Sequence, residues 1–357
     1  MTKNYCQIAA QYCRYVLNGK IDACLYVKQA CQRQINDLKR KDKNWGYEFN
    51  ETLANRVCVF IECLKHIEGP LAGTFIQLQP WQCFILTTVF GWVRKGTYYR
   101  RYRTAYVEVP RGNGKSTLLS GVGLYTLCAD NEAGAQVYSA ATKKDQAKIV
   151  FKAARLMAER NPDLVSYYHL DVREHTIQGD GGAAVFEPIS SDAKSQDGFN
   201  VHCAIIDELH AHKTRDLYDV IETGARKRPQ SLIFAITTAG TNLAGICMER
   251  RNLVVSILGG EAEIESVFGI IYTLDENDAW DNLNALKKAN PNWGISVDPV
   301  SMTEALKTAK FTKSAENNFK TKHLDIWVNA DTSWCELKDY DACVDKKIKP
   351  SMFKGEQ

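Results

Sequence analysis

The sequence predicts an α/β fold in which a mostly parallel sheet is flanked by helices. From residue 104 onward, short apolar runs alternate with stretches whose apolar residues recur every three or four positions. The apolar runs lack the polar alternation of half-exposed strands, which is typical of strands covered by helices on both faces. This β–α alternation indicates a parallel sheet.

The first 100 residues predict helices. Apolar residues recur at helical spacing over residues 6–17, 21–38 and 53–67, and the segment 69–73, which contains two glycines and a proline, ends the third helix. A fourth helix is expected over residues 80–92, with Pro80 in its first turn. We therefore treat residues 1–100 as a helical N-terminal region.

The middle of the chain supplies the sheet. Strands are expected over residues 105–109, 136–140, 184–186, 201–206, 231–237 and 267–272. Helices are expected between them over residues 115–128, 142–160 and 243–258, with a capping box formed by Thr142 and Asp145 at the start of the second. Residues 101–275 are predicted to form the core. Residues 276–357 are predicted to form a small linker subdomain and tail, with a turn at 290–294 and a helix over 302–310.

The composition excludes several protein classes. Of the 357 residues 45% are hydrophobic and 24% are charged, as in ordinary globular proteins. No apolar run approaches the roughly 20 residues of a membrane span, and the chain does not open on a signal peptide. Twelve cysteines without a C-x-x-C pair favour a reducing cytosol. The first four form two pairs, Cys6 with Cys13 and Cys24 with Cys31, and the seven-residue step within each pair is typical of a buried helix face.

Basic residues form clusters although the net charge is only +3. They lie at residues 39–41, 94–103 and 226–228. Such clusters are either solvated faces or contacts to a nucleic acid or nucleotide phosphate.

A glycine-rich segment lies between a predicted strand and a predicted helix, which is the context that a phosphate-binding P-loop requires. Glycines allow backbone N–H groups to approach phosphate oxygens, and the helix N-terminus favours negative charge. Lys115 is expected to reach the β- and γ-phosphates of ATP, and the Ser116 hydroxyl to ligate Mg²⁺. The first glycine of the usual pattern is replaced by Val109, and the alternative is a glycine turn that only joins strand to helix. The predicted nucleotide-binding residues here are Arg111, Gly112, Asn113, Gly114, Lys115, Ser116 and Thr117.

Two carboxylates follow an apolar strand, as in a Walker B motif. Asp207 is expected to hold Mg²⁺ and Glu208 to polarise the attacking water. The alternative is a solvent-facing loop. The 92 positions between Lys115 and Asp207 (207 − 115) leave room for intervening β–α units, which favours the catalytic interpretation.

The next predicted strand ends in two threonines, Thr237 and Thr238. A hydroxyl at this position can sense the γ-phosphate or its attacking water, and the alternative is a cap of the following helix. The neighbouring His210 and His212 do not have the ligand spacing of a closed zinc site.

Together these motifs resemble the large terminase subunit of tailed bacteriophages. The resemblance covers about residues 50–335 and includes the segments 110–116, 205–210 and 237–240, the segment Leu78–Gln82 and the segment 140–147. Val109 is consistent with it, since the Walker A motif of that family is deviant and carries an arginine. The resemblance implies a RecA-like P-loop ATPase with a helical N-terminal lid and a small C-terminal linker subdomain.

The resemblance also implies residue roles. Gln82 would recognise adenine, with Trp81 as a packing wall or an ordinary buried tryptophan. Arg111 would act in cis on the developing charge, and Thr237 and Thr238 match a coupling motif. A cation from the next subunit of a ring would complete the site; the candidates are Lys194, Arg226 and Arg228.

The implied function is an ATP-driven motor that packages double-stranded DNA into a procapsid in the cytoplasm of the infected bacterium. Its expected partners are DNA, a portal ring and a small terminase subunit, with no membrane. The alternatives are a helicase-like DNA-stimulated ATPase and a non-hydrolysing nucleotide-binding scaffold. A nuclease domain follows the ATPase in that family; Asp339, Asp341 and Asp345 do not show the pattern of its metal site, so nuclease activity is not expected in this chain.

Overall fold

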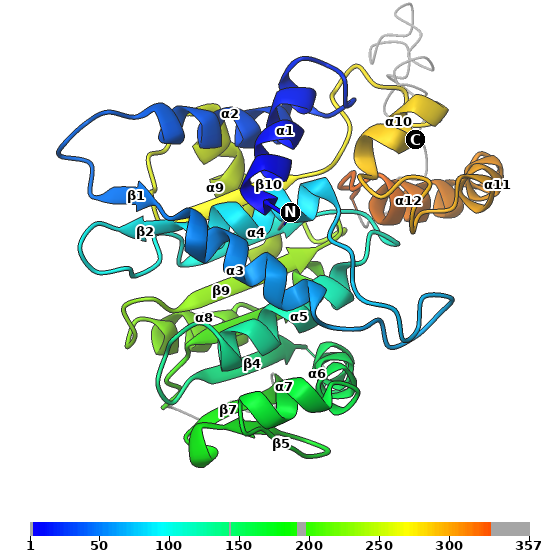
Figure 1. Ribbon diagram of the computed structural model, residues 1–357. Coiled ribbons are helices and arrows are strands. Elements are labelled where there is room, and N and C mark those ends of the chain that lie inside the picture. The colour runs from blue at the N-terminus through cyan, green and yellow to red at the C-terminus, as the bar shows by residue number, and fades with distance from the viewer. Residues whose placement is uncertain (1–2, 143, 191–197, 330–357) are drawn as a thin grey trace, which may run out of the picture.

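The computed structural model describes residues 3–142, 144–190 and 198–329 and is built around an eight-stranded sheet (Figure 1). The first six strands in the sheet order are parallel, and the last two are antiparallel to their neighbours. The predicted α/β fold with a mostly parallel sheet is confirmed. The order is β10 (Val267–Ile271), β3 (Thr104–Glu108), β9 (Leu232–Thr237), β8 (Cys203–Asp207), β4 (Gln136–Ala141), β7 (Ala184–Ser190), β6 (Ile177–Gly179) and β5 (Asp171–Val172).

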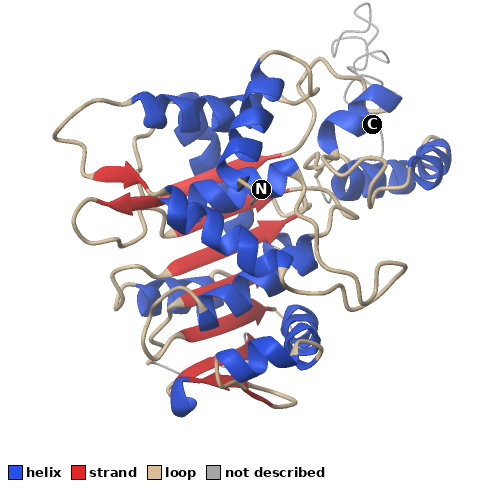
Figure 2. Cartoon of the chain, viewed as in Figure 1, coloured by secondary structure: helices blue, strands red, loops and turns tan. Residues whose placement is uncertain are grey.

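Helices cover both faces of the sheet, which explains why the central strands are apolar throughout (Figure 2). The helices α5 (Lys115–Cys128) and α6 (Lys144–Glu159) pack on one face. The helices α8 (Asp216–Ala225) and α9 (Ile246–Gly259) follow crossovers in the opposite direction and pack on the other face. The α6 helix begins two residues later than predicted, and Thr142 donates a hydrogen bond to the Gln146 side chain at 3.0 Å.

The α5 helix lies unusually close to its neighbours because two of its residues are glycines. A Cβ on Gly123 would come within 2.7 Å of the Phe186 ring and 2.8 Å of Ile205, both on the sheet. A Cβ on Gly121 would lie 3.0 Å from Ile61 of α3 (Glu51–Glu62). The α5 helix is therefore clamped between the sheet and α3.

Four helices precede the sheet, α1 (Tyr5–Leu17), α2 (Leu25–Lys39), α3 and α4 (Pro80–Gly91). The α2 helix begins at residue 25 and not at 21, because Cys24 takes an extended conformation as its N-cap. The α3 helix ends five residues earlier than predicted, because the backbone of Leu64 and His66 pairs instead with residues 73–76. A small antiparallel pair, β1 (Tyr47–Phe49) and β2 (Trp92–Arg94), was not predicted.

Three helices near the end of the described chain form a second, smaller hydrophobic cluster around Leu286, Met302 and Phe319. They are α10 (Leu283–Ala289), α11 (Pro299–Ala309) and α12 (Lys313–His323), and they lie at one end of the sheet (Figure 1). The α11 helix begins three residues earlier than predicted, because the Asp298 carboxylate accepts hydrogen bonds from the backbone of residues 300 and 301. The sequence analysis missed α10, α12, α8, α7 (Pro162–Tyr167) and the β5–β6 hairpin.

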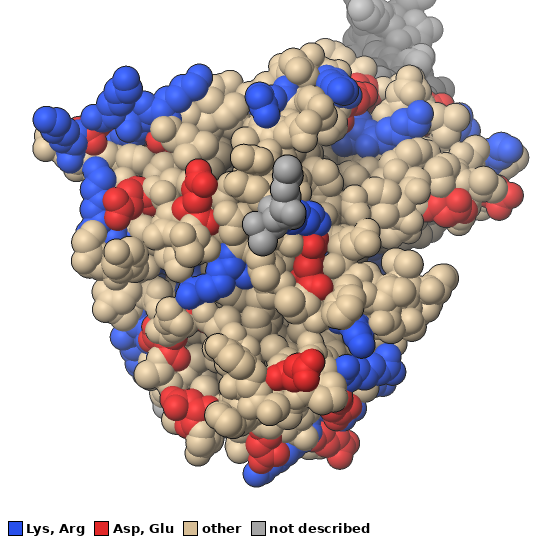
Figure 3. Space-filling view, viewed as in Figure 1, with Lys and Arg blue, Asp and Glu red and all other residues tan. Residues whose placement is uncertain are grey.

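Charged side chains of both signs share the surface. On the face drawn in Figure 3, Lys and Arg are interspersed with Asp and Glu, and the densest basic group lies over the end of α2. No helix among the described residues is long and apolar enough to span a bilayer. Of the first four cysteines, Cys13, Cys24 and Cys31 are buried and Cys6 is partly buried, as the seven-residue spacing predicts.

Candidate nucleotide site

The glycine-rich loop joins the end of β3 to the start of α5. Gly112 has φ +86° and Gly114 has φ +75°, a left-handed conformation that side chains with a Cβ rarely adopt. Gly114 is also the N-cap of α5, so the loop runs directly into the positive end of the helix dipole. The sequence therefore folds here as a P-loop does.

The carbonyl side of this loop is held by side chains. Asn113 Nδ2 donates to Pro110 O at 3.0 Å, Asn292 Nδ2 donates to Asn113 O at 3.2 Å, and Ser296 Oγ donates to Gly112 O at 2.6 Å. Within the described part of the chain, no acceptor is present for the N–H groups of residues 112–114. Because the carbonyls are engaged and the N–H groups are not, the loop presents a donor surface that fits a phosphate chain.

Lys115 is buried beside the loop. Its Nζ donates to Val109 O at 3.0 Å and to Pro110 O at 3.2 Å. Burial lowers the pKa of Lys115, and the negative charges of Glu208, Asp325 and Asp207 oppose that shift. The ammonium group is thus within electrostatic reach of the acid pair.

The acid pair stands at the carboxyl end of β8. Burial and the charge of Glu208 raise the pKa of Asp207 to about 6. Burial also acts to raise the pKa of Glu208, but a hydrogen bond from His210 and the charge of Lys115 lower it to about 2. Glu208 has φ +53°, a strained conformation for a residue with a Cβ, which is a feature often found at functional sites. The two carboxylates therefore differ in pKa although they are adjacent in sequence.

The strand β9 lies between β3 and β8 and brings two threonines beside Glu208. Thr238 Oγ1 is 3.5 Å from Glu208 Oε2, and Thr237 Oγ1 accepts a hydrogen bond from His210 N at 3.0 Å. The α9 helix begins at Ile246 with Gly245 as its N-cap, so neither threonine caps it. The alternative of a helix cap is excluded.

The predicted adenine-binding residues lie on the first turn of α4. The amide of Gln82 lies near the loop, 3.8 Å from the position of a Cβ on Gly114, and Gln82 Oε1 accepts from Gln79 N at 2.9 Å. Trp81 is buried, and its Nε1 donates to Asn292 Oδ1 at 2.7 Å. Trp81 therefore braces the segment that holds the P-loop and does not offer an exposed ring.

The candidate cations for a neighbouring subunit are placed differently. Lys194 lies outside the described residues. Arg226 is exposed at the end of α8. Arg228 is engaged within the chain, with Nη1 2.7 Å from Glu132 Oε1 and Nη2 2.6 Å from Gly134 O. Only Arg226 of the two described arginines is exposed to a neighbour.

Two segments of the site were missed by the sequence analysis. Residues 290–297, of which only 290–294 were predicted, as a turn, hold the P-loop through Asn292 and Ser296. Residues 322–327 run past the same edge: Arg111 N donates to Lys322 O at 2.9 Å, and Ala239 N donates to Asp325 Oδ1 at 3.0 Å. Trp327 Nε1 also donates to Glu108 Oε1 at 3.2 Å. Neither segment carries a sequence motif that would have identified it as part of the site.

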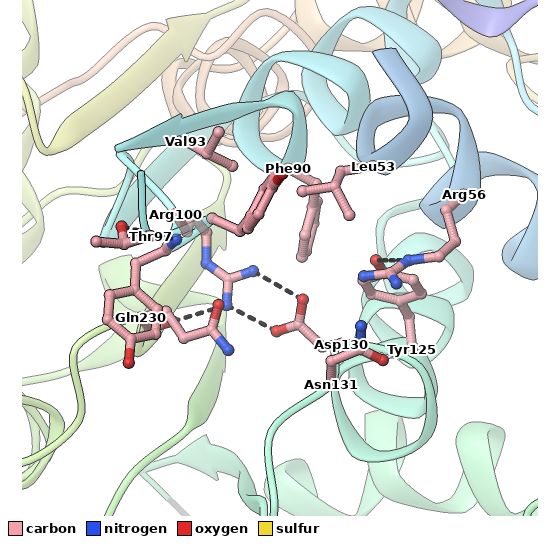
Figure 4. Close-up of a pocket in the computed structure, with 12 residues that line it drawn as sticks. Leu53, Arg56, Phe90, Val93, Thr97, Arg100, Tyr125, Asp130, Asn131 and Gln230 are labelled. Atoms are coloured by element: carbon pink, nitrogen blue, oxygen red, sulfur yellow. Dashed lines mark hydrogen bonds and ion pairs between the residues drawn. The ribbon is translucent and has the colours of Figure 1, made fainter. Parts of the chain in front are cut away.

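A second cavity, of about 150 Å³, lies at the opposite edge of the sheet (Figure 4). Arg100 donates to both oxygens of Asp130, at 3.1 and 2.7 Å, and to Gln230 O at 2.7 Å. Arg56 Nε donates to the Tyr125 hydroxyl at 3.0 Å. The charged groups of this cavity are hydrogen-bonded within the chain, and none of the motif residues lines it.

Comparison with known proteins identifies the family. Residues 80–255, which include the P-loop, the acid pair and both threonines, match the family described as the terminase large subunit, ATPase domain. The chain contains a terminase large subunit ATPase domain. This ATPase domain is similar to the large terminase subunit of Enterobacteria phage HK97, with 24% identity over 302 residues that cover 83% of this chain and 58% of the relative.

Two further comparisons concern a second relative and the fold. Protein YmfN of Escherichia coli K12 is 42% identical over 160 residues, which cover 45% of this chain and 35% of that protein. The crystal structure of the HK97 large terminase matches with a TM-score of 0.66 and 23% identity, over 77% of this chain and 55% of that one, and so has the same fold. The chain therefore spans about half or less of the length of these relatives.

Proposed function

We propose that this terminase domain hydrolyses ATP with Mg²⁺ at the carboxyl edge of its sheet. The observation that supports this proposal is the strand register. Because Glu108 of β3 pairs with Thr237 of β9, and Asp207 of β8 pairs with Ile236, the P-loop, the threonines and the acid pair all lie at one edge. Lys115 is close enough to both carboxylates to influence their pKa values.

Each residue has a role that its position supports. The free N–H groups of residues 112–114 and the Lys115 ammonium hold the phosphates, with Thr117 in the first turn of α5. Ser116 and Asp207 hold Mg²⁺, which neutralises phosphate charge when bound. Glu208, ionised because its pKa is low, accepts a proton from the attacking water. Arg111 acts on the transferred phosphoryl group, Thr238 senses it, and Gln82 recognises adenine.

We further propose that hydrolysis drives double-stranded DNA into a procapsid, as the motor of a bacteriophage in its host's cytoplasm. The support is the family and the similarity to a phage protein named as a terminase large subunit. The expected partners are a portal ring and a small terminase subunit. We assign residues 1–100 as lid, 101–275 as ATPase core and 276–357 as linker subdomain and tail.

The deciding experiment separates binding from hydrolysis. Lys115→Ala removes a phosphate contact, so it should abolish turnover and weaken ATP binding. Glu208→Gln removes the proton acceptor, so it should bind ATP normally and retain it. Phosphate release and fluorescent-nucleotide binding measure the two effects. Normal steady-state hydrolysis by Glu208→Gln would disprove the catalytic assignment, and absence of hydrolysis by the wild type would favour a nucleotide-binding scaffold.

The motor proposal has its own test. ATPase rate is measured with and without DNA, portal and procapsids. If Lys194, Arg226 or Arg228 of a neighbour completes the site, specific activity should rise with protein concentration or on addition of portal. A rate independent of concentration and equal to the portal-stimulated rate would exclude a shared site. Strand displacement without packaging would favour the helicase-like alternative.

A further inference from the structure

A histidine joins the acid pair to the C-terminal helical cluster. His210 Nδ1 lies 3.1 Å from Glu208 Oε2, and the other ring nitrogen, Nε2, lies 3.1 Å from Lys322 Nζ. Lys322 belongs to α12 and is half-buried. The imidazole therefore bridges a proposed catalytic carboxylate and a cation from a segment more than 100 residues away in sequence.

The hydrogen-bond donors around the ring determine its tautomer. A lysine ammonium group can only donate, so Nε2 must accept and carries no proton. On the other side, Thr237 Oγ1 donates its proton to Thr238 O at 2.9 Å, so it can only accept from His210 Nδ1, which is 3.1 Å away. Both constraints place the proton on Nδ1. This N–H then faces three oxygens, Thr237 Oγ1 at 3.1 Å, Glu208 Oε2 at 3.1 Å and Thr238 Oγ1 at 3.4 Å.

We propose that His210 is a positioning residue for Glu208 and that Lys322 fixes His210 in the tautomer that this task requires. With the proton on Nδ1, the imidazole donates to the Glu208 carboxylate and holds it at the position that it occupies beside Thr238. With the proton on Nε2, a lone pair on Nδ1 would face the carboxylate and repel it. This inference rests on the proposed ATPase function and adds to it a control of Glu208 by another part of the chain.

The proposal connects hydrolysis to the placement of α12. The same residue, Lys322, supplies its backbone carbonyl to Arg111 N of the P-loop and its side chain to His210 of the acid-pair segment. A displacement of α12 would therefore release both contacts together. The C-terminal cluster would in this way control whether Glu208 is held ready to accept a proton.

The kinetic test compares substitutions that remove a single hydrogen-bond donor with substitutions that keep it. Lys322→Met keeps the length of the side chain and removes the ammonium, so kcat should fall about 10-fold or more while KM for ATP is unchanged, because orientation of an acid–base group contributes to kcat. Lys322→Arg restores a donor and should recover most of that loss. His210→Asn places an amide N–H near the position of Nδ1 and should keep more activity than His210→Gln, whose amide lies near Nε2.

The matched control is an exposed lysine elsewhere in the C-terminal helical cluster. Lys307→Met, at an exposed position on α11 of the same cluster, should leave kcat unchanged. Unchanged kcat in Lys322→Met would overturn the role of Lys322, and a raised KM with full kcat would mark it as a phosphate contact instead. Equal losses in His210→Asn and His210→Gln would overturn the role of the Nδ1 donor. Thermal unfolding of each variant identifies any general loss of fold.

The tautomer can be measured without turnover. Long-range ¹H–¹⁵N correlation spectra of protein labelled at histidine should show His210 with Nδ1 protonated and Nε2 unprotonated, and Lys322→Met should shift this ring towards the other tautomer. An Nε2-protonated ring in the wild type would overturn the proposal. Because this readout needs no ATP, it separates failure of the positioning role from failure of the proposed ATPase function.

Discussion

The two edges of the sheet contain similar charged side chains in contrasting arrangements. At the amino edge, where the parallel strands begin, Arg100 is paired with Asp130, and Asp130 also lies 2.8 Å from His202 Nε2. Burial opposes ionisation of Asp130, yet the charge of Arg100 and the hydrogen bond with His202 lower its pKa to about 2. The buried charges of Arg100 and Asp130 therefore compensate each other.

At the carboxyl edge, charges of the same sign lie close to one another. Lys322 lies near Arg111 and Lys115, and after burial these two cations are the largest causes that lower its pKa. Asp207 lies next to Glu208, which raises its pKa. Groups whose pKa values are shifted by burial and by specific charged neighbours are typical of functional sites. The contrast supports the proposal that the carboxyl edge binds an anion and a metal ion, whereas the ion pair at the amino edge belongs to the fold.

The largest expected effect compares one glutamate from each edge. Glu208→Gln should lower kcat by about 10⁴-fold, the upper range for a positioned acid–base group. Glu132→Gln, at the amino edge, should leave kcat unchanged, because the polar partners of Glu132 among the described residues are Arg228, Gln230 and His202. Steady-state phosphate release measures both variants. Comparable losses would show that the two edges do not differ as we infer.

Arginines provide the second comparison. Arg111→Ala should lower kcat about 10³-fold if the guanidinium stabilises the transferred phosphoryl group, the scale of an arginine finger. Its backbone contact to Lys322 O does not depend on the side chain. Arg103→Ala is the control, since Arg103 donates to Ala225 O and Ser231 Oγ at the amino edge; it should cost stability and not kcat. Weaker ATP binding with full kcat in Arg111→Ala would make Arg111 a binding residue.

Substitutions at the amino edge should change the stability of the fold and not kcat. Asp130→Asn leaves the buried Arg100 without its counter-charge and should lower the free energy of unfolding by about 3–5 kcal/mol. Denaturant unfolding measures this change. Asp171→Asn, which breaks an exposed pair with Arg173, should cost less than about 1 kcal/mol. A cost for Asp130→Asn as small as that of Asp171→Asn would contradict a structural role for the amino edge.

The smallest expected effect concerns pH. The pKa of Asp207 is about 6 in the folded protein and near 3.8 in the unfolded chain, so the folded state binds the proton more tightly. The free energy of unfolding should then fall as pH rises from about 4 through 6. Asp207→Asn removes this penalty and should stabilise the nucleotide-free, metal-free protein at pH 7.5 by about 1–3 kcal/mol. The gain should shrink towards pH 4; a gain of equal size at both pH values would point to another cause.

The sequence predicted those parts of the molecule whose residue pattern lies within one continuous segment. The P-loop and the α5 helix were predicted with correct bounds because glycines, a lysine and an apolar helix follow one another directly. The acid pair was found because its strand is apolar up to Asp207. The predicted helix ends were wrong where contacts between distant segments determine them, as at Cys24 and at residues 64–66.

The missed parts of the site depend on contacts between distant segments. Asn292 and Lys322 are ordinary polar residues in their own segments, and only the fold brings them to residues 111–114. The amino-edge network could not be predicted for the same reason, since Arg100, Asp130 and His202 precede three different strands. Basic runs such as 226–228 gave no indication that Arg228 is engaged within the chain.

The glycines of α5 determine which side of the nucleotide site is rigid and which side can move. Gly121 and Gly123 let the helix lie against Ile61, Phe186 and Ile205 with no space for even a methyl group, so the helix that begins at Lys115 is the stiff side. The opposite side, residues 290–297 and 322–327, is attached to the loop mainly through hydrogen bonds, which open at a smaller cost than close packing. A movement coupled to the proposed hydrolysis would therefore be taken up by the C-terminal side, while α5 stays in place against the sheet.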